Sequence, residues 1–140
     1  MPSQSCYEKQ NVSLREWKMH QFVYDLNIVN VPKIISYNKT TRVMRTAYLG
    51  DCSISSLYGE EPTDVPEDTF DTIREIIKKL YIHGITYPDI TGYNFLETTD
   101  RTWIIDFEHA RYVPTHKAKR YDKFIDKFMD GHNGWNPRFR

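Results

Sequence analysis

Residues 83–109 read HGITYPDITGYNFLETTDRTWIIDFEH and contain the most informative spacing in this chain. Asp89 lies in a loop after a predicted helix, Asn94 follows five residues later, and the apolar run 102–105 leads to Asp106. We expect the loop to expose Asp89. Two carboxylates and one amide placed in this way can hold a divalent cation through oxygen ligands. They also leave one carboxylate to deprotonate an attacking hydroxyl.

The same residues resemble the catalytic segment of the protein-kinase superfamily, in which Asp-x4-Asn precedes a hairpin and an Asp-Phe-Gly motif. Here Asp89 to Asn94 reads DITGYN, and Asp106 begins Asp-Phe-Glu. His83-Gly84 and Thr91 look most like the small atypical branch, the RIO-type and antibiotic-phosphotransferase-type kinases. The resemblance implies that Asp89 is the catalytic base. It implies that Asn94 and Asp106 bind Mg²⁺ against the phosphates of ATP.

The resemblance continues toward the N-terminus in the order that the family has. A predicted helix over 13–27 corresponds to the regulatory helix, whose Glu16 would pair with the phosphate-binding lysine, here Lys9. Residues 46–50, TAYLG, are similar to the hinge that binds adenine through backbone groups, with Thr46 as the gatekeeper. The resemblance therefore implies a nucleotide site that comprises Lys9, Glu16, Thr46, Ala47 and Leu49.

Two of these residues also have simpler interpretations. Ser13 and Glu16 fit a capping box at a helix start, and this pattern favours a capping role for Glu16 over an ion pair. Lys9 lies only seven residues before Glu16, which favours a flexible surface lysine. Glu108 stands where the family has glycine, and we expect it to be a solvated loop acid.

The chain also departs from the family pattern. Only eight residues precede Lys9, so we expect no Gly-rich hairpin over the phosphates, and Tyr87-Pro88 replaces the usual His-Arg before the base. We therefore expect an α+β protein with a minimal protein-kinase-like fold, in one domain over residues 1–140. Residues 1–50 would form a reduced N-terminal lobe and hinge, and residues 51–140 a truncated C-terminal helical lobe.

Hydrophobic periodicity and turn residues predict the local elements. Helices are expected over 13–27, 66–81 and 121–129, a short helical turn over 53–58, and strands over 33–37, 42–49, 93–96 and 102–105. The helix over 66–81 has one apolar stripe, formed by Phe70, Ile73, Ile77 and Leu80. We expect Pro66 at its first position and Gly84 as its left-handed cap.

The composition favours a globular intracellular protein and excludes some functions. Nineteen basic and nineteen acidic residues give a net charge of zero, which argues against a nucleic-acid partner. No apolar run is long enough to span a membrane. Residues 1–4 lack the features of a secretion signal, so we expect a soluble protein in the cytoplasm or nucleus. Cys6 and Cys52 are expected to be free thiols, and one disulfide stays open.

Two functions of different classes follow. The first is an ATP- and Mg²⁺-dependent phosphotransferase, most simply a small atypical Ser/Thr protein kinase; a small-molecule kinase would use the same site. The second is a catalytically inactive pseudokinase that binds a protein partner or mimics a kinase. The intact set of Asp89, Asn94 and Asp106 favours the enzyme, whereas the missing upper-lobe parts favour the pseudokinase. A protein substrate or partner is expected in both, and a homodimer stays open.

Overall fold

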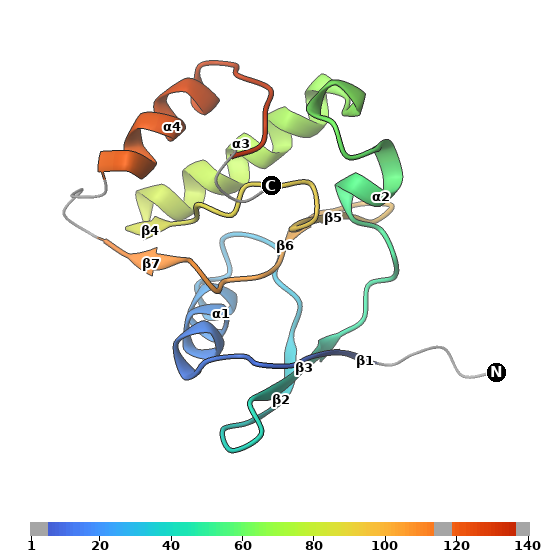
Figure 1. The fold of residues 1–140 in the computed structure, drawn as a ribbon, viewed down its shortest axis with the longest axis vertical. Coiled ribbons are helices and arrows are strands. Elements are labelled where there is room, and N and C mark those ends of the chain that lie inside the picture. The colour runs from blue at the N-terminus through green and yellow to red at the C-terminus, as the bar shows by residue number, and fades with distance from the viewer. Residues whose placement is uncertain (1–5, 114–118, 137–140) are drawn as a thin grey trace.

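The computed structural model describes residues 6–113 and 119–136 of this chain, so the expectation about residues 1–4 lies outside the described residues. Figure 1 shows the order of the elements. They are β1 (Cys6–Lys9), α1 (Leu14–Leu26), β2 (Ile34–Asn38), β3 (Val43–Ala47), α2 (Ile54–Tyr58), a 3₁₀ turn (Pro62–Asp64), α3 (Glu67–Ile82), β4 (Ile85–Thr86), β5 (Phe95–Glu97), β6 (Thr102–Ile104), β7 (Arg111–Tyr112) and α4 (Lys119–Met129). The predicted helices, the hairpin and the later strand pair are all present.

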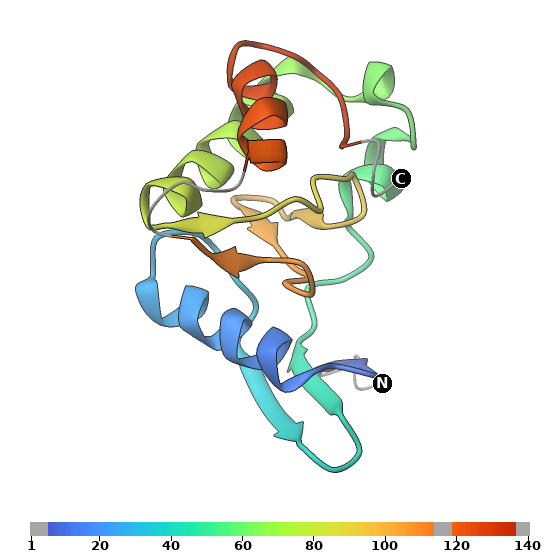
Figure 2. The same cartoon turned by 60° about the vertical axis from the view of Figure 1, so that its left-hand side comes forward.

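A three-stranded antiparallel sheet and α1 form the N-terminal part of the molecule (Figures 1 and 2). The strand order is β1-β3-β2, and the hairpin of β2 and β3 was predicted. β1 was not, because a four-residue strand is too short to show a clear alternation. Its pairing with β3 places Lys9 opposite Met44 and so fixes this lysine on the sheet.

Helix α1 begins as its sequence predicts. The Ser13 side chain accepts a hydrogen bond from the Glu16 amide at 3.1 Å, which is the serine half of a capping box. The helix ends at Asn27, which adopts the left-handed conformation with φ 55°. Val23 on its inner face is fully buried, so α1 is joined to the main hydrophobic core.

Helix α3 is the centre of the C-terminal part. The four residues of its predicted stripe are all fully buried: Phe70, Ile73, Ile77 and Leu80. Pro66 was predicted at the first helical position but is the N-cap residue, directly before Glu67. Gly84 takes the expected left-handed conformation with φ 80°. Phe128 of α4 packs edge-on against Phe70, with the ring centroids 6.4 Å apart. This contact anchors α4 on α3.

Two short strand pairs flank the loops that contain Asp89, Asn94 and Asp106. β4 pairs with β7, and β5 pairs with β6, both antiparallel (Figure 2). The first pair was not predicted, because strands of two residues have no periodicity. Between the two pairs run residues 87–94 and residues 105–110, which are thereby fixed at both ends.

The mixture of helices and small sheets agrees with the predicted α+β class. One hydrophobic core extends from Val23 in α1 to Phe128 in α4. Cys6 and Cys52 are not joined to each other by a disulfide. None of the helices in the described ranges is long and apolar enough to cross a membrane. The division into lobes at residue 50 stays a prediction.

Gly92 lies in the loop of residues 87–94 and is required there by close packing. A Cβ added at Gly92 would lie 2.3 Å from the Ser55 hydroxyl oxygen and 3.1 Å from the Trp135 ring. The Ser55 amide donates to the Gly92 carbonyl at 2.9 Å, so α2 cannot move away without losing this bond. Gly92 therefore sets the distance between α2 and the loop.

We expect Gly92→Ala to destabilise the protein by about 1–3 kcal/mol through overpacking. Ser55→Ala alone should be neutral or stabilising, because its buried hydroxyl has no hydrogen-bond partner among the described residues. The double variant should recover part of the loss, since the nearest clashing atom is gone. Urea unfolding of all four proteins measures this coupling, and strictly additive effects would contradict it.

Candidate functional site

One pocket contains every residue that the sequence analysis assigned to the nucleotide and the metal. Its volume is about 530 Å³, within the usual range for small-molecule sites. The expected residues on its wall are Lys9, Glu16, Thr46, Ala47, Leu49, Asn94 and Asp106. A larger hollow of about 810 Å³ lies on the 97–102 turn and α3, and none of these residues lines it.

Lys9 lies between two carboxylates at one side of this pocket. Its Nζ donates to Glu16 Oε2 at 2.6 Å and to Asp106 Oδ1 at 3.2 Å. Burial lowers the pKa of Lys9, but the hydrogen bond to Glu16 and the charge of Asp106 outweigh it, so the pKa is raised and the ammonium stays charged. β1, α1 and the segment after β6 are thereby linked by a single cation.

The preference for a capping role of the Glu16 carboxylate was therefore wrong, and so was a flexible surface Lys9. The Glu16 side chain is only 3% exposed, and its carboxylate binds Lys9. Ser13 still caps the helix through the Glu16 amide, so the two functions use different atoms of the same residue. The sequence pattern could not separate them, because the position of β1 decides where the carboxylate points.

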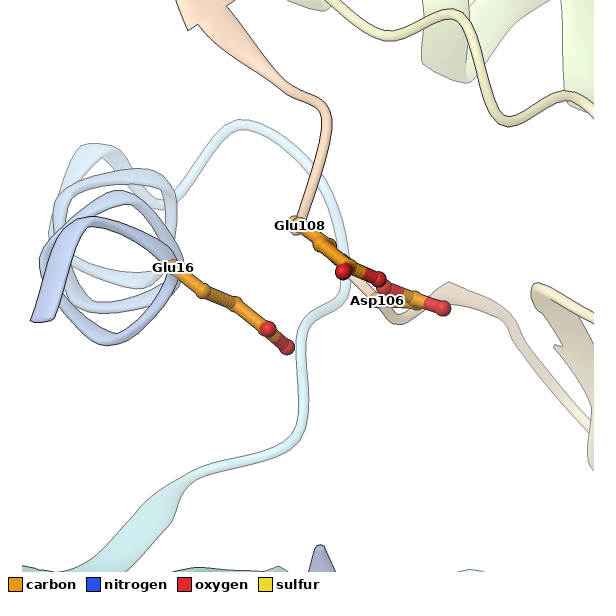
Figure 3. A group of neighbouring side chains, drawn as sticks. All are labelled: Glu16, Asp106 and Glu108. Atoms are coloured by element: carbon orange, nitrogen blue, oxygen red, sulfur yellow. The ribbon is translucent and has the colours of Figure 1, made fainter. Parts of the chain in front are cut away.

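Asp106 and Glu108 lie opposite Glu16, as Figure 3 shows. One carboxylate oxygen from each of the three lies within 4.8 Å of the others. Glu108 is exposed, as expected, and its amide donates to Asp106 Oδ1 at 3.3 Å. Asp106 itself has φ 61°, a left-handed conformation that aspartate tolerates better than most residues. Such backbone strain concentrates at functional sites.

Tyr87, which replaces the histidine of the family pattern, binds the segment that leads to Asp106. It is fully buried, and its hydroxyl donates to the Ile105 carbonyl, directly before Asp106. Its ring packs edge-on against Phe107, with centroids 5.6 Å apart. Burial raises the pKa of Tyr87 well above its ordinary value, so the phenol stays a donor. Tyr87 therefore links the two loops.

Asp89 is buried, not exposed as predicted. It is 5% exposed, and its Oδ2 lies 2.7 Å from His109 Nδ1. Burial raises the pKa of Asp89, although the hydrogen bond and charge of His109 oppose the shift. Asp89 is not among the residues that line the pocket. The contact with His109 was not predicted, because no motif spacing joins His109 to Asp89.

Asn94 connects Asp89 to Asp106. Its side-chain Nδ2 donates to the Asp89 carbonyl at 3.0 Å, and the Ile105 amide donates to the Asn94 carbonyl at 3.0 Å. With the amide nitrogen directed to Asp89, the Asn94 side chain retains its Oδ1 as an acceptor. Asn94 Oδ1 and the Asp106 carboxylate are the hard oxygen atoms that Mg²⁺ prefers, so this donor set fits the ion.

The fold and this site define a kinase-like domain. A solved structure described as the Rio2 kinase–ADP/Mg²⁺–phosphoaspartate complex from Chaetomium thermophilum matches it with a TM-score of 0.62 and 16% identity. The match covers 85% of this chain and 36% of that chain, so this chain spans about a third of the Rio2 kinase. No curated protein matches the sequence.

The model of the RIO domain family matches residues 5–126, and this chain belongs to that family. The expected resemblance to RIO-type atypical kinases is thereby confirmed. The minimal kinase-like fold is confirmed as well, because the Rio2 structure shares it over most of this chain.

Proposed function

We propose that this protein is an atypical kinase that binds ATP and Mg²⁺ in the pocket of about 530 Å³ and transfers the γ-phosphoryl group to a hydroxyl. The observation that supports this most strongly is the position of Lys9 between Glu16 and Asp106, on the wall of a pocket that Asn94 also lines. A charged lysine held in this way is suited to contact phosphate oxygens. The Rio2 kinase described above was solved with ADP and Mg²⁺, which agrees with the proposal.

Each residue has a distinct task in this proposal. Asn94 and Asp106 would hold Mg²⁺, which supplies neutralisation of the phosphate charge when bound. The backbone of residues 46–49 would receive the adenine, and Lys9, held by Glu16, would orient the phosphates. In phosphoryl transfer the protein forms few covalent bonds itself. The correct placement of the nucleotide and the metal by these residues therefore provides most of the catalysis.

Asp89 would accept the proton of the acceptor hydroxyl. As that oxygen bonds to the γ-phosphorus, the bond to the bridging oxygen breaks and ADP leaves with its electron pair. His109 holds the Asp89 carboxylate at 2.7 Å and so limits its rotation. Ser or Thr side chains of a protein are the acceptors we propose; a small-molecule alcohol would use the same geometry.

A specific observation also favours the second candidate, a pseudokinase that binds a partner protein. Lys9 already forms ion pairs with Glu16 and Asp106. Asp89, the proposed base, is buried and is not among the residues that line the pocket. Under this alternative, the Lys9 ion pairs would stabilise the fold without a nucleotide.

A thermal-shift titration with ATP, in the presence and absence of Mg²⁺, separates the two candidates. A ligand that binds the folded state raises Tm by an amount that grows with its concentration. We expect a rise that requires Mg²⁺. No shift at millimolar nucleotide would reject the kinase and favour the binding module.

Transfer is then measured with γ-labelled ATP and a mixed protein substrate. Label that is stable to hydroxylamine is expected for a Ser or Thr acceptor. Because the Rio2 complex contains a phosphoaspartate, an aspartate acceptor is tested in the same assay. Its acyl phosphate would be lost in hydroxylamine, and this outcome would overturn the hydroxyl acceptor.

A further inference from the structure

Residues 134–136 contact the catalytic loop of residues 87–94. They lie beyond the family match, which ends at residue 126. The sequence of residues 131–140 has no clear hydrophobic period. Yet Trp135 and Asn136 are both only 6% exposed. Their burial indicates that they have a structural partner, and the hydrogen bonds identify it.

Asn136 binds the backbone on both sides of Asp89. Its side-chain Nδ2 donates to the Pro88 carbonyl at 2.8 Å. Its backbone amide donates to the Ile90 carbonyl, also at 2.8 Å. The carbonyl between them, that of Asp89, accepts from Asn94 Nδ2. Three consecutive carbonyls are thus held by two asparagines.

The backbone at Asp89 needs such support because it turns tightly. The Ile90 amide donates to the Pro88 carbonyl at 2.8 Å, so Asp89 is the central residue of a three-residue turn. The turn itself provides a donor for the Pro88 carbonyl but none for the Ile90 carbonyl, and a buried carbonyl without a partner is costly. Asn136 donates to the Ile90 carbonyl and gives the Pro88 carbonyl a second donor.

Trp135 fixes Asn136 in this position. Its ring packs against Phe70 of α3 with centroids 4.9 Å apart, and its Nε1 donates to the Glu60 carbonyl at 3.2 Å. The ring also borders the space next to Gly92. Trp135 and Asn136, which we call the clamp, therefore contact the hydrophobic core, the loop before α3 and the catalytic loop.

We propose that Asn136 is a positioning residue that holds Asp89 in place for phosphoryl transfer. Its role in turnover rests on the proposed function, whereas its effect on the loop does not. Asn136 binds the backbone on both sides of Asp89 and is not among the residues that line the nucleotide pocket, so we expect it to act on the rate and not on nucleotide affinity.

The test compares Asn136→Ala with Asn133→Ala by hydrogen exchange of the backbone amides. Asn133 is an exposed asparagine in the same segment whose side chain binds Arg74, away from the catalytic loop, so it is a matched control. In Asn136→Ala we expect exchange in residues 87–94 to become about tenfold faster, as the loss of one hydrogen bond predicts. Asn133→Ala should leave it unchanged. Unchanged exchange in Asn136→Ala would overturn the clamp.

The kinetic arm then tests positioning. We expect Asn136→Ala to lower the transfer rate about tenfold with unchanged affinity for Mg²⁺–ATP, and Asn136→Gln, which retains the amide donor, to recover part of it. If affinity falls with rate, or if Asn133→Ala loses as much, the positioning role is rejected. If the wild type transfers no phosphate, the proposed function fails, and the exchange experiment alone decides on the clamp.

Discussion

Asp106→Asn is expected to abolish the Mg²⁺ dependence of ATP binding and to lower phosphoryl transfer by roughly a hundredfold or more. The size follows from the several kcal/mol of charge stabilisation that a bound metal supplies. Asparagine retains a side-chain oxygen for the Glu108 amide and for Lys9, and it tolerates the φ of 61° at this position. The substitution therefore removes charge while leaving the local backbone as it is.

Glu108→Gln is the matched control for this prediction. Glu108 lies next to Asp106 and undergoes the same loss of one negative charge, but its side chain is exposed. We expect it to retain binding and most of the transfer rate. Isothermal titration with ATP at several Mg²⁺ concentrations measures both variants. Equal losses of affinity in the two variants would mean that Glu16, Asp106 and Glu108 act only through their total charge. An unchanged affinity for Mg²⁺–ATP in Asp106→Asn would reject the metal role of Asp106.

The longer elements were predictable because their patterns repeat. α3 shows its apolar stripe over about three turns, and all four residues of that stripe are fully buried. α1 shows a cap that the structure contains. β1, β4 and β7 were missed since strands of two to four residues contain too few alternations to stand out. Tertiary pairing, not local preference, makes them strands.

The sequence predicted which residues form the candidate site, but it did not predict the contacts that those residues make. Asn94 and Asp106 were identified from their spacing and Lys9 from the family resemblance, and all three line one pocket. Asp89 was expected to be exposed, yet His109 and Asn136 enclose it from segments that no motif connects to it. The motif that identifies a catalytic loop contains only residues of the loop. The burial of that loop depends on residues from later segments, here His109 and Asn136, which the motif does not include.

Asp89→Asn should lower the transfer rate by about 10²–10⁴, the usual contribution of general base catalysis. Asparagine has nearly the same volume, so it can occupy the buried position. Because Asp89 does not line the pocket, the affinity for Mg²⁺–ATP should not change. Asp100→Asn, in the exposed turn before β6, controls for the loss of an aspartate charge elsewhere. Turnover retained by Asp89→Asn would contradict its role as base.

The pH dependence of the rate tests the same residue without removing it. The base must be ionised, and burial raises the pKa of Asp89, so the rate should begin to fall, as the pH is lowered, at a higher pH than for an ordinary aspartate. The His109 hydrogen bond opposes this shift. Removing it in His109→Ala should therefore raise the pKa of Asp89 further and move the acidic limb of the pH–rate profile upward. A limb that stays in place or moves downward would show that a different group accepts the proton.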